Sequence, residues 1–253
     1  MTDNILSAQK VYKSFGGVRA LNGIDLEIER GEMAGIIGPN GSGKSTLFNC
    51  ISGVLRSDSG TIIFKGNPIE RKSASEIYHM GIARTFQNPR LFSTMTVLEN
   101  LLVPPKGQKG EKIVDAPVHS RWDNQEYELG ARARDVLKTL SLDQVEGNSA
   151  QNISGGQMKL LEIGRALMSD PELVLLDEPT AGVLPDLAEK ILSKLVELQK
   201  KSNITFLIIE HRLDILFRFV NYSYVMHQGR LLFEGSPQEI MQNATVAEVY
   251  LGG

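Results

Sequence analysis

Residues 38–46 read Gly38-Pro39-Asn40-Gly41-Ser42-Gly43-Lys44-Ser45-Thr46. They fit the pattern G-x-x-x-x-G-K-[ST], in which backbone N–H groups wrap an oligophosphate, the lysine reaches the β- and γ-phosphates, and the hydroxyl binds Mg²⁺. A continuous apolar run from Met33 to Ile37 precedes the stretch, and we expect a helix over Thr46 to Ser52 after it. Because the pattern requires a strand, a loop and a helix in this order, a P-loop is favoured over a chance glycine-rich turn.

A second phosphate-binding pattern lies far downstream, at Ile153-Ser154-Gly155-Gly156-Gln157. A Ser-Gly-Gly turn that opens a helix presents unpaired amides and the positive end of the helix dipole, which together can hold a phosphate. One chain does not need two such sites for one γ-phosphate. Two chains placed head to tail do need them, because each then closes over the nucleotide of the other.

A third pattern is an apolar strand that ends in two carboxylates, Leu173-Val174-Leu175-Leu176-Asp177-Glu178. The carboxyl end of a parallel strand is where α/β folds bind their ligands. Taken alone, the run is equally consistent with a solvated acidic turn, but the presence of a P-loop favours the functional interpretation.

Composition limits the class of protein. The 253 residues suit one domain or two close subdomains, and 27 Lys and Arg against 30 Asp and Glu give a net charge of -3, which offers no electrostatic case for nucleic acid or anionic lipid. The single cysteine, Cys50, excludes an internal disulfide and is expected to be a small buried hydrophobe in the helix after the P-loop. The sequence shows no secretion signal and no apolar run of membrane-spanning length, so we expect any membrane role to act through a partner from the cytoplasmic face.

Hydrophobic periodicity predicts the order of the elements. Residues 24–29 and 61–64 favour a half-exposed antiparallel sheet, and a polar Pro/Gly-rich segment at 104–110 indicates a surface loop. One face of a helix is marked by Leu129, Ala133, Val136, Leu137 and Leu140. A later helix has an apolar face formed by Ala188, Ile191, Leu192, Leu195 and Leu198.

The end of the chain predicts a strand over 204–209, a hairpin that turns near Gln228-Gly229, and a last helix. That helix begins at Ser236-Pro237-Gln238-Glu239, where serine caps, proline occupies the first turn and glutamate completes a capping box.

Together these motifs resemble the ATP-binding cassette (ABC) ATPases, and the resemblance extends from about Ile5 to the C-terminus. It implies an α/β fold: a P-loop NTPase with a RecA-like core, an antiparallel β subdomain and an inserted α-helical subdomain. The core with the β subdomain would span residues 1–87 and 169–253, and the helical signature subdomain would span residues 88–168.

The resemblance also implies roles for single residues. Asp177 would hold Mg²⁺ together with Ser45, and Glu178 would polarise the attacking water. Gln87 matches the glutamine that contacts Mg²⁺ or the water, and His211 matches the histidine that touches the γ-phosphate. Phe15 aligns with the aromatic side chain that stacks on adenine, although Tyr12 is a competitor and an aromatic residue in a strand is often simply core. The signature that binds the ATP of the other chain consists of Ser154, Gly155, Gly156 and Gln157.

Two departures from the family pattern occur. Ile153 stands where leucine is commoner, which preserves an apolar anchor. In the D-loop, Ala181-Gly182-Val183-Leu184, Leu184 occupies the position of an aspartate that normally helps to bind the two protomers. Gly182, Glu210 and the segments 84–92, 95–100 and 156–167 are similar to the ATPase subunits of branched-chain amino-acid importers.

The function implied is hydrolysis of ATP with Mg²⁺, coupled to import of branched-chain amino acids. The partners implied are a second cassette in a head-to-tail dimer, two membrane permeases and, indirectly, a substrate-binding protein, with the chain on the inner face of the cell membrane and no nucleic acid bound. Another cargo such as urea or lipopolysaccharide is the alternative. A soluble ABC protein of DNA repair or translation would need a long coiled coil or tandem cassettes, and this chain has neither.

Overall fold

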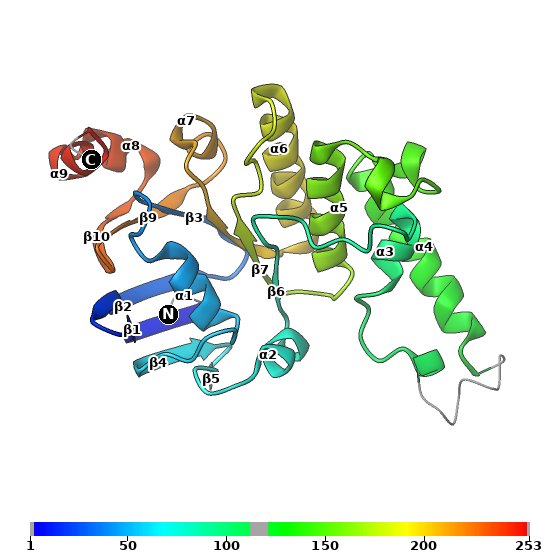
Figure 1. Cartoon of the computed structure of the whole chain (residues 1–253), viewed down its shortest axis with the longest axis horizontal. Helices are drawn as coiled ribbons and strands as arrows, with labels where there is room; N and C mark the ends of the chain where they lie inside the picture. Colours follow the sequence, from blue (N-terminus) through cyan, green and yellow to red (C-terminus); the bar gives the residue numbers. More distant parts are fainter. Residues whose placement is uncertain (1–2, 112–120, 252–253) are drawn as a thin grey trace. The chain divides into compact units, whose positions relative to one another are not determined.

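The computed structural model describes residues 3–111 and 121–251, and the chain divides into two compact units (Figure 1). Unit 1 is formed by residues 1–87 and 172–253, and unit 2 by residues 88–171. Unit 1 carries both β-sheets, whereas unit 2 is helical.

Unit 1 contains an antiparallel sheet in the order β2-β1-β4-β5. Its strands are β1 (Asn4–Phe15), β2 (Val18–Glu29), β4 (Ser59–Phe64) and β5 (Asn67–Pro68). In β2 the apolar residues Ile24, Leu26 and Ile28 are buried and the acidic residues between them are exposed, as the alternating pattern predicts. The expected short strand over 24–29 is only the second half of β2. Strands β1 and β2 each have 12 residues, and their pairing continues through several shifts of register.

The second sheet of unit 1 has the order β10-β9-β3-β8-β7-β6. It consists of β3 (Met33–Ile37), β6 (Ile82–Arg84), β7 (Leu173–Asp177), β8 (Thr205–Ile209), β9 (Tyr222–His227) and β10 (Arg230–Gly235). All pairs are parallel except β9 with β10. Every residue of β3, β7 and β8 is buried, which explains why these strands read as continuous apolar runs.

Helix α1 (Lys44–Ile51) packs between the two sheets of unit 1 (Figure 1). Its Leu47, Phe48 and Ile51 belong to one buried cluster with side chains from both sheets. On the far side of the parallel sheet lie α6 (Pro185–Ser202) and α7 (Leu213–Leu216), and the predicted apolar face of α6 is buried throughout. The helix of the P-loop therefore starts inside the core of unit 1.

Short elements complete unit 1. Helix α2 (Ala74–Met80) starts at a capping box, and the β9–β10 hairpin turns at Gln228 and Gly229, which both have positive φ. The predicted capping box at Ser236 opens α8 (Pro237–Gln242). The prediction of one last helix was wrong, because a further helix, α9 (Ala244–Leu251), follows Asn243.

Unit 2 contains α3 (Val97–Leu102), α4 (Asp123–Thr139) and α5 (Gly155–Leu167) with the 3₁₀ turns η1 (Lys109–Glu111), η3 (Asp143–Val145) and η4 (Ala150–Asn152). Helix α4 packs on α3 and α5. Of its predicted apolar face, Ala133, Leu137 and Leu140 are fully buried. A helix with one such face needs neighbours to cover it, and α3 and α5 provide them.

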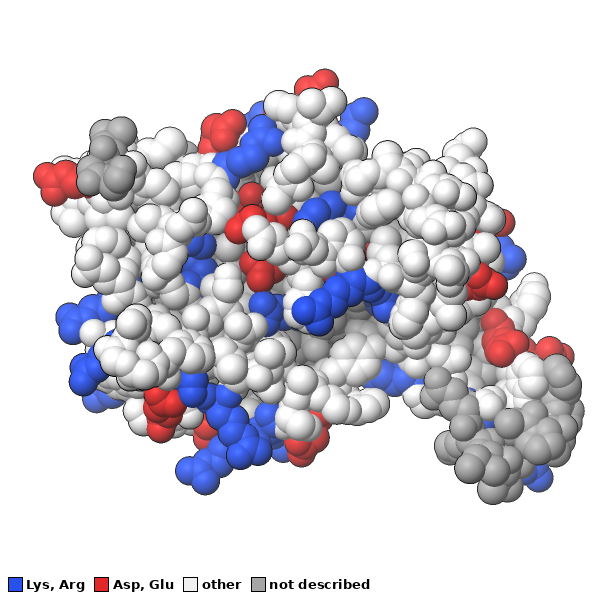
Figure 2. All heavy atoms as spheres, in the orientation of Figure 1, with Lys and Arg blue, Asp and Glu red and all other residues white. Residues whose placement is uncertain are grey.

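Among the helices of residues 3–111 and 121–251, none combines the length and the apolar character that crossing a bilayer requires. Figure 2 shows acidic and basic side chains mixed over the face in view, as the nearly balanced 27 basic and 30 acidic residues lead one to expect.

The burial of α6 can be tested by truncation. We expect Leu192→Ala, at a fully buried position, to lower the free energy of unfolding by about 2–5 kcal/mol, because it removes buried methyl groups and leaves a cavity. The matched control is Leu184→Ala, at a position that is 78% exposed, which should change it by less than about 0.5 kcal/mol. Equal effects of the two substitutions in chemical denaturation would contradict the packing described for α6.

Candidate functional site

The P-loop, residues 38–46, joins β3 to α1 and depends on two glycines. Gly43 is the N-cap of α1 with a φ of 104°, and a Cβ atom there would lie 2.4 Å from the carbonyl oxygen of Ala20. At Gly38 a Cβ atom would lie 2.1 Å from the carbonyl oxygen of Met226. Larger residues at these two positions would push the loop away from the backbone that supports it, so the spacing of the motif is enforced by close packing.

Lys44 begins α1 and is buried. Its ammonium donates to the carbonyl oxygens of Gly38 at 2.8 Å and Pro39 at 2.9 Å, so it is held against the loop that it is predicted to serve. Burial lowers the pKa of Lys44, and the nearby carboxylates of Glu178 and Asp177 oppose this shift. The two carboxylates are thus close enough to the lysine for their charges to act on it.

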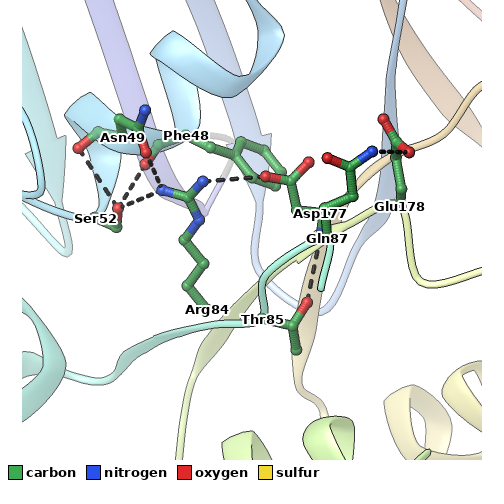
Figure 3. A network of polar contacts seen from close by, with 8 residues as sticks. All are labelled: Phe48, Asn49, Ser52, Arg84, Thr85, Gln87, Asp177 and Glu178. Atoms are coloured by element: carbon green, nitrogen blue, oxygen red, sulfur yellow. Dashed lines mark hydrogen bonds and ion pairs between the residues drawn. The ribbon is translucent and has the colours of Figure 1, made fainter. Parts of the chain in front are cut away.

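Asp177 ends β7 and forms a buried ion pair with Arg84, which ends β6 (Figure 3). Arg84 Nη2 lies 3.1 Å from Asp177 Oδ2, and the two side chains are only 8% and 9% exposed. The amide of Asp177 also donates to the hydroxyl of Thr85 at 3.3 Å. The carboxylate predicted to hold Mg²⁺ is therefore fixed by neighbours from the adjacent strand.

The same arginine reaches the helix of the P-loop (Figure 3). Its Nη1 donates to Asn49 Oδ1 at 2.6 Å and to Ser52 Oγ at 3.0 Å, and its guanidinium lies 5.7 Å from the ring centre of Phe48. Because one planar group contacts both α1 and β7, the P-loop helix and the acidic strand end are held in a fixed relation.

Glu178 follows Asp177 and is held from two sides. Its Oε2 accepts a hydrogen bond from Gln87 Nε2 at 2.9 Å (Figure 3), and its Oε1 lies 3.0 Å from His211 Nε2. Glu178 has a φ of 50°, a left-handed conformation that is costly for a residue with a side chain and that often occurs at functional sites. The structure thus brings together Gln87, Glu178 and His211, which are far apart in the sequence.

The remaining predicted residues of unit 1 lie at its surface or beside the loop. Ser45 is exposed in the first turn of α1, Thr46 is half-buried, Asn40 and Gly41 are exposed, and Ser42 is buried. Phe15 ends β1 with 48% of its surface exposed, and Lys13 Nζ lies 5.6 Å from its ring centre. Since it is not part of the core, Phe15 is available to a planar ligand, as is the 36% exposed Tyr12.

The signature residues lie in unit 2 and form a helix N-terminus. Ser154 is the N-cap of α5, accepts from the amide of Gln157 and forms a capping box with it. Gly155 is exposed in the first turn, Gly156 is buried, and Ile153 is buried just before the cap. The prediction that the Ser-Gly-Gly turn opens a helix is confirmed, and the structure adds that Ser154 caps it. What it binds remains a prediction.

Burial raises the pKa of the Cys50 thiol to about 11, so this side chain is protonated at neutral pH. The prediction of a buried cysteine in α1 is confirmed.

Sequence reasoning missed Arg84 and its contacts with Asn49 and Ser52. Arg84 is the last residue of the short strand β6, three positions before Gln87, so its place next to a predicted Q-loop was a usable signal. Glu210 was noted only for its resemblance to one branch of the family, and its burial beside His211 was not foreseen. The usable signal for Glu210 was its place directly after an apolar strand and before the predicted switch histidine.

The oxygen donors near the P-loop fit a hard divalent cation. Serine, aspartate and glutamine offer hydroxyl, carboxylate and amide oxygens, which suit Mg²⁺. Within the part of the chain that the structure describes, no group of three or more His, Cys, Asp and Glu side chains is arranged to hold a metal ion.

Comparison with protein-family models gives two matches. Residues 21–181 match the family described as ABC transporter. Residues 230–253 match the family described as branched-chain amino acid ATP-binding cassette transporter.

Similar proteins agree with these matches. A probable branched-chain amino acid transport ATP-binding protein LivG from Archaeoglobus fulgidus is 46% identical, covering 98% of this chain and 95% of that protein. The crystal structure of the ADP conformation of an ATP-binding cassette of an ABC transporter is 42% identical, with a TM-score of 0.86 and 99% of each chain covered. A dimeric structure of a bacterial ABC transporter cassette is 25% identical, with a TM-score of 0.77, covering 92% of this chain and 98% of that one.

The buried ion pair can be tested by removing its cation. We expect Arg84→Ala to lower the free energy of unfolding by about 3–5 kcal/mol, because it leaves the carboxylate of Asp177 buried without its partner. The control is Arg30→Ala, which removes the ion pair with Glu172, where both side chains are about a third exposed. That loss should cost at most about 1 kcal/mol. Urea denaturation of both variants measures the difference, and similar values would contradict a special role for the Arg84–Asp177 pair.

Proposed function

The chain belongs to the ABC transporter family of ATP-binding cassettes, and we propose that it is the ATP-hydrolysing subunit of an importer of branched-chain amino acids. The prediction of a P-loop NTPase fold is confirmed, since solved cassettes of this family share it over nearly the whole chain.

One observation supports hydrolysis most directly: three polar side chains from separate segments meet at the end of β7. Glu178 contacts both Gln87 and His211, and its charge is felt by the P-loop lysine. A carboxylate held by two neighbours beside a phosphate-binding loop is suited to orient a water molecule and accept its proton. The water oxygen would attack the γ-phosphorus, and the bond to ADP would break, which gives ADP and phosphate.

The other residues of unit 1 bind and neutralise the nucleotide. The backbone amides of residues 38–46 would surround the phosphates, and Lys44 would exchange its contacts with loop carbonyls for phosphate oxygens. His211 would contact the γ-phosphate, and Phe15 would stack on the adenine ring. Catalysis of this kind consists mainly of positioning and charge stabilisation.

When bound, Mg²⁺ would supply positive charge that offsets the negative charge developing on the transferred phosphate. Ser45, Gln87 and Asp177 are the residues that would hold it, with the hydroxyl of Ser45 at the start of α1 and the carboxylate of Asp177 at the end of β7.

A second cassette would complete the site. Ser154, Gly155, Gly156 and Gln157 would bind the γ-phosphate of the nucleotide on the partner, in a head-to-tail dimer. A bacterial ABC transporter cassette with this fold has a dimeric structure. We place residues 88–168 in the helical signature subdomain and residues 1–87 and 169–253 in the core.

We base the proposed partners and location of this chain on the proposed cargo, branched-chain amino acids. The family model that matches residues 230–253 and the names of the relatives both indicate branched-chain amino acids. The cassette would act on two integral membrane permeases at the inner face of the cell membrane, and a substrate-binding protein would deliver the amino acid to them. Transport of labelled leucine by reconstituted permeases with this cassette, against urea as a control cargo, tests the assignment.

We expect Glu178→Gln to bind ATP like the parent but to hydrolyse it about 10²–10⁴ times more slowly, because it removes the proton acceptor and keeps the shape. Steady-state phosphate release and fluorescent-ATP titration measure the two quantities. The variant should also accumulate as a dimer with Mg·ATP in sedimentation, since the closed state no longer ends by hydrolysis.

The matched control for this substitution is Glu197→Gln, an exposed glutamate of α6, which should hydrolyse ATP like the parent. Parental turnover in Glu178→Gln would remove this residue from the role of proton acceptor.

The D-loop offers a second prediction. Leu184 is the N-cap of α6 and its side chain does not cap the helix, so Leu184→Asp should raise monomer stability by about 1 kcal/mol through a new cap. We expect the same change to alter dimerisation and turnover while leaving ATP affinity of the monomer unchanged, because this exposed side chain would face the partner. Leu184→Asn, which caps without the charge, is the control. Weaker ATP binding by the Leu184→Asp monomer would show that the loop faces its own nucleotide.

A further inference from the structure

A buried carboxylate lies directly beside the predicted switch histidine. Glu210 follows β8, precedes His211 and is only 2% exposed. Burying a carboxylate costs several kcal/mol unless hydrogen bonds replace the lost water. A carboxylate buried to this extent needs hydrogen-bond donors, and the donors that it has indicate its role.

The two oxygens of Glu210 accept from two different loops. Oε1 accepts from the amide of Thr180 at 2.8 Å and from its hydroxyl at 2.7 Å. Oε2 accepts from the amide of His211 at 3.3 Å. Thr180 lies in the loop that runs from Glu178 into the D-loop, residues 181–184. One side chain thus joins the loop after β7 to the loop after β8.

The contact of Glu210 with Thr180 lies just beyond the last backbone hydrogen bond between the segments of β7 and β8. The pairing of β7 with β8 ends at Asp177 and Ile209, and one further backbone bond runs from the amide of Glu178 to the carbonyl oxygen of Ile209 at 2.9 Å. Beyond that point the carboxylate of Glu210 links the two segments. Arg212 adds a second tie, because its Nη1 donates to the carbonyl oxygen of Val183 at 3.3 Å.

We infer that Glu210 is a positioning residue that joins His211 to the loop of Glu178 and the D-loop, so that the two loops move as one body. The inference rests on the function proposed above, because it assigns Glu210 a task within the same hydrolysis site. A displacement of the D-loop would then reach His211 through Thr180 and Glu210, without passing through the nucleotide.

The chemistry requires a carboxylate at this position. An amide has one oxygen that accepts and one nitrogen that only donates. In Glu210→Gln one end of the side chain would therefore present N–H groups to the amide of either Thr180 or His211. The substitution keeps the size of the side chain and breaks the link on one side.

The experiment compares Glu210→Gln with the same substitution at another glutamate that also accepts hydrogen bonds from a backbone amide and a hydroxyl. We expect Glu210→Gln to lower kcat for ATP by about ten- to a hundredfold, the factor that corresponds to one hydrogen bond to a charged group, and to change KM by less than about twofold. The matched control is Glu239→Gln. Glu239 also accepts from an amide and a hydroxyl, those of Ser236, but with a single oxygen, so an amide oxygen can replace it. Its kcat should equal that of the parent.

A double-mutant cycle separates positioning from general stability. If Glu210 acts through His211, Glu210→Gln should have no further effect on kcat in a His211→Ala background. The imidazole ¹⁵N signals of His211 report the same link without turnover and should shift in Glu210→Gln but not in Glu239→Gln. Should Glu210→Gln fold poorly, Thr180→Val should repeat its effect in part and Thr180→Ser should preserve the parental values.

Some results would overturn the inference. A parental kcat and unshifted His211 signals in Glu210→Gln would show that the link is unimportant. An equal loss of kcat with and without His211 would reduce Glu210 to a structural residue. Failure of the parent itself to hydrolyse ATP would instead contradict the proposed function, and the His211 signals would then decide the inference alone.

Discussion

The candidate site depends on one buried ion pair, which places a cation and an anion at neighbouring strand ends. Arg84 ends β6 and Asp177 ends β7, and the parallel register of these strands pairs Arg84 with Leu175. Parallel strands end at the same edge of a sheet, so the arginine reaches the carboxylate without leaving its strand. Its Nη1 donates to Asn49 and Ser52 at the end of α1, which ties the sheet edge to the helix that carries the P-loop. A lysine could not make these forked contacts.

The residues proposed to be catalytic lie on loops that follow this edge of the sheet, and these loops are themselves held by hydrogen bonds. Glu178 has a left-handed backbone, yet its amide is bonded to Ile209 and its carboxylate contacts Gln87 and His211. Such a conformation persists only where the surroundings over-determine it. In phosphoryl transfer the protein acts mainly by positioning the reacting groups and stabilising charge. The strained backbone at Glu178 is consistent with a site in which positioning contributes most to catalysis.

Local signals allowed the sequence to predict much of this architecture. The strand Met33–Ile37, the helix that opens at the Ser-Gly-Gly turn and the capping box at Ser236 were predicted because an apolar run, a glycine turn or a serine three positions before glutamate acts over a few residues. Arg84 and Glu210 could not be assigned, because their partners are 93 and 30 residues away along the chain and only the strand order brings them together. The helix α9 was missed for another reason: it follows α8 after one residue, without a proline or glycine between them.

Leu184 lowers the stability of α6, and within the described residues its side chain makes no contribution to the core that would offset this loss. It occupies the N-cap of α6, where an aspartate, serine or asparagine would accept from the first amides of the helix. Its side chain is 78% exposed, so it does not add to the core of its own unit. Covering this leucine by another surface would be favourable, because it would remove apolar area from water. The D-loop therefore combines a weaker cap with an apolar side chain directed outward, and both features are explained if a second cassette covers it during closure.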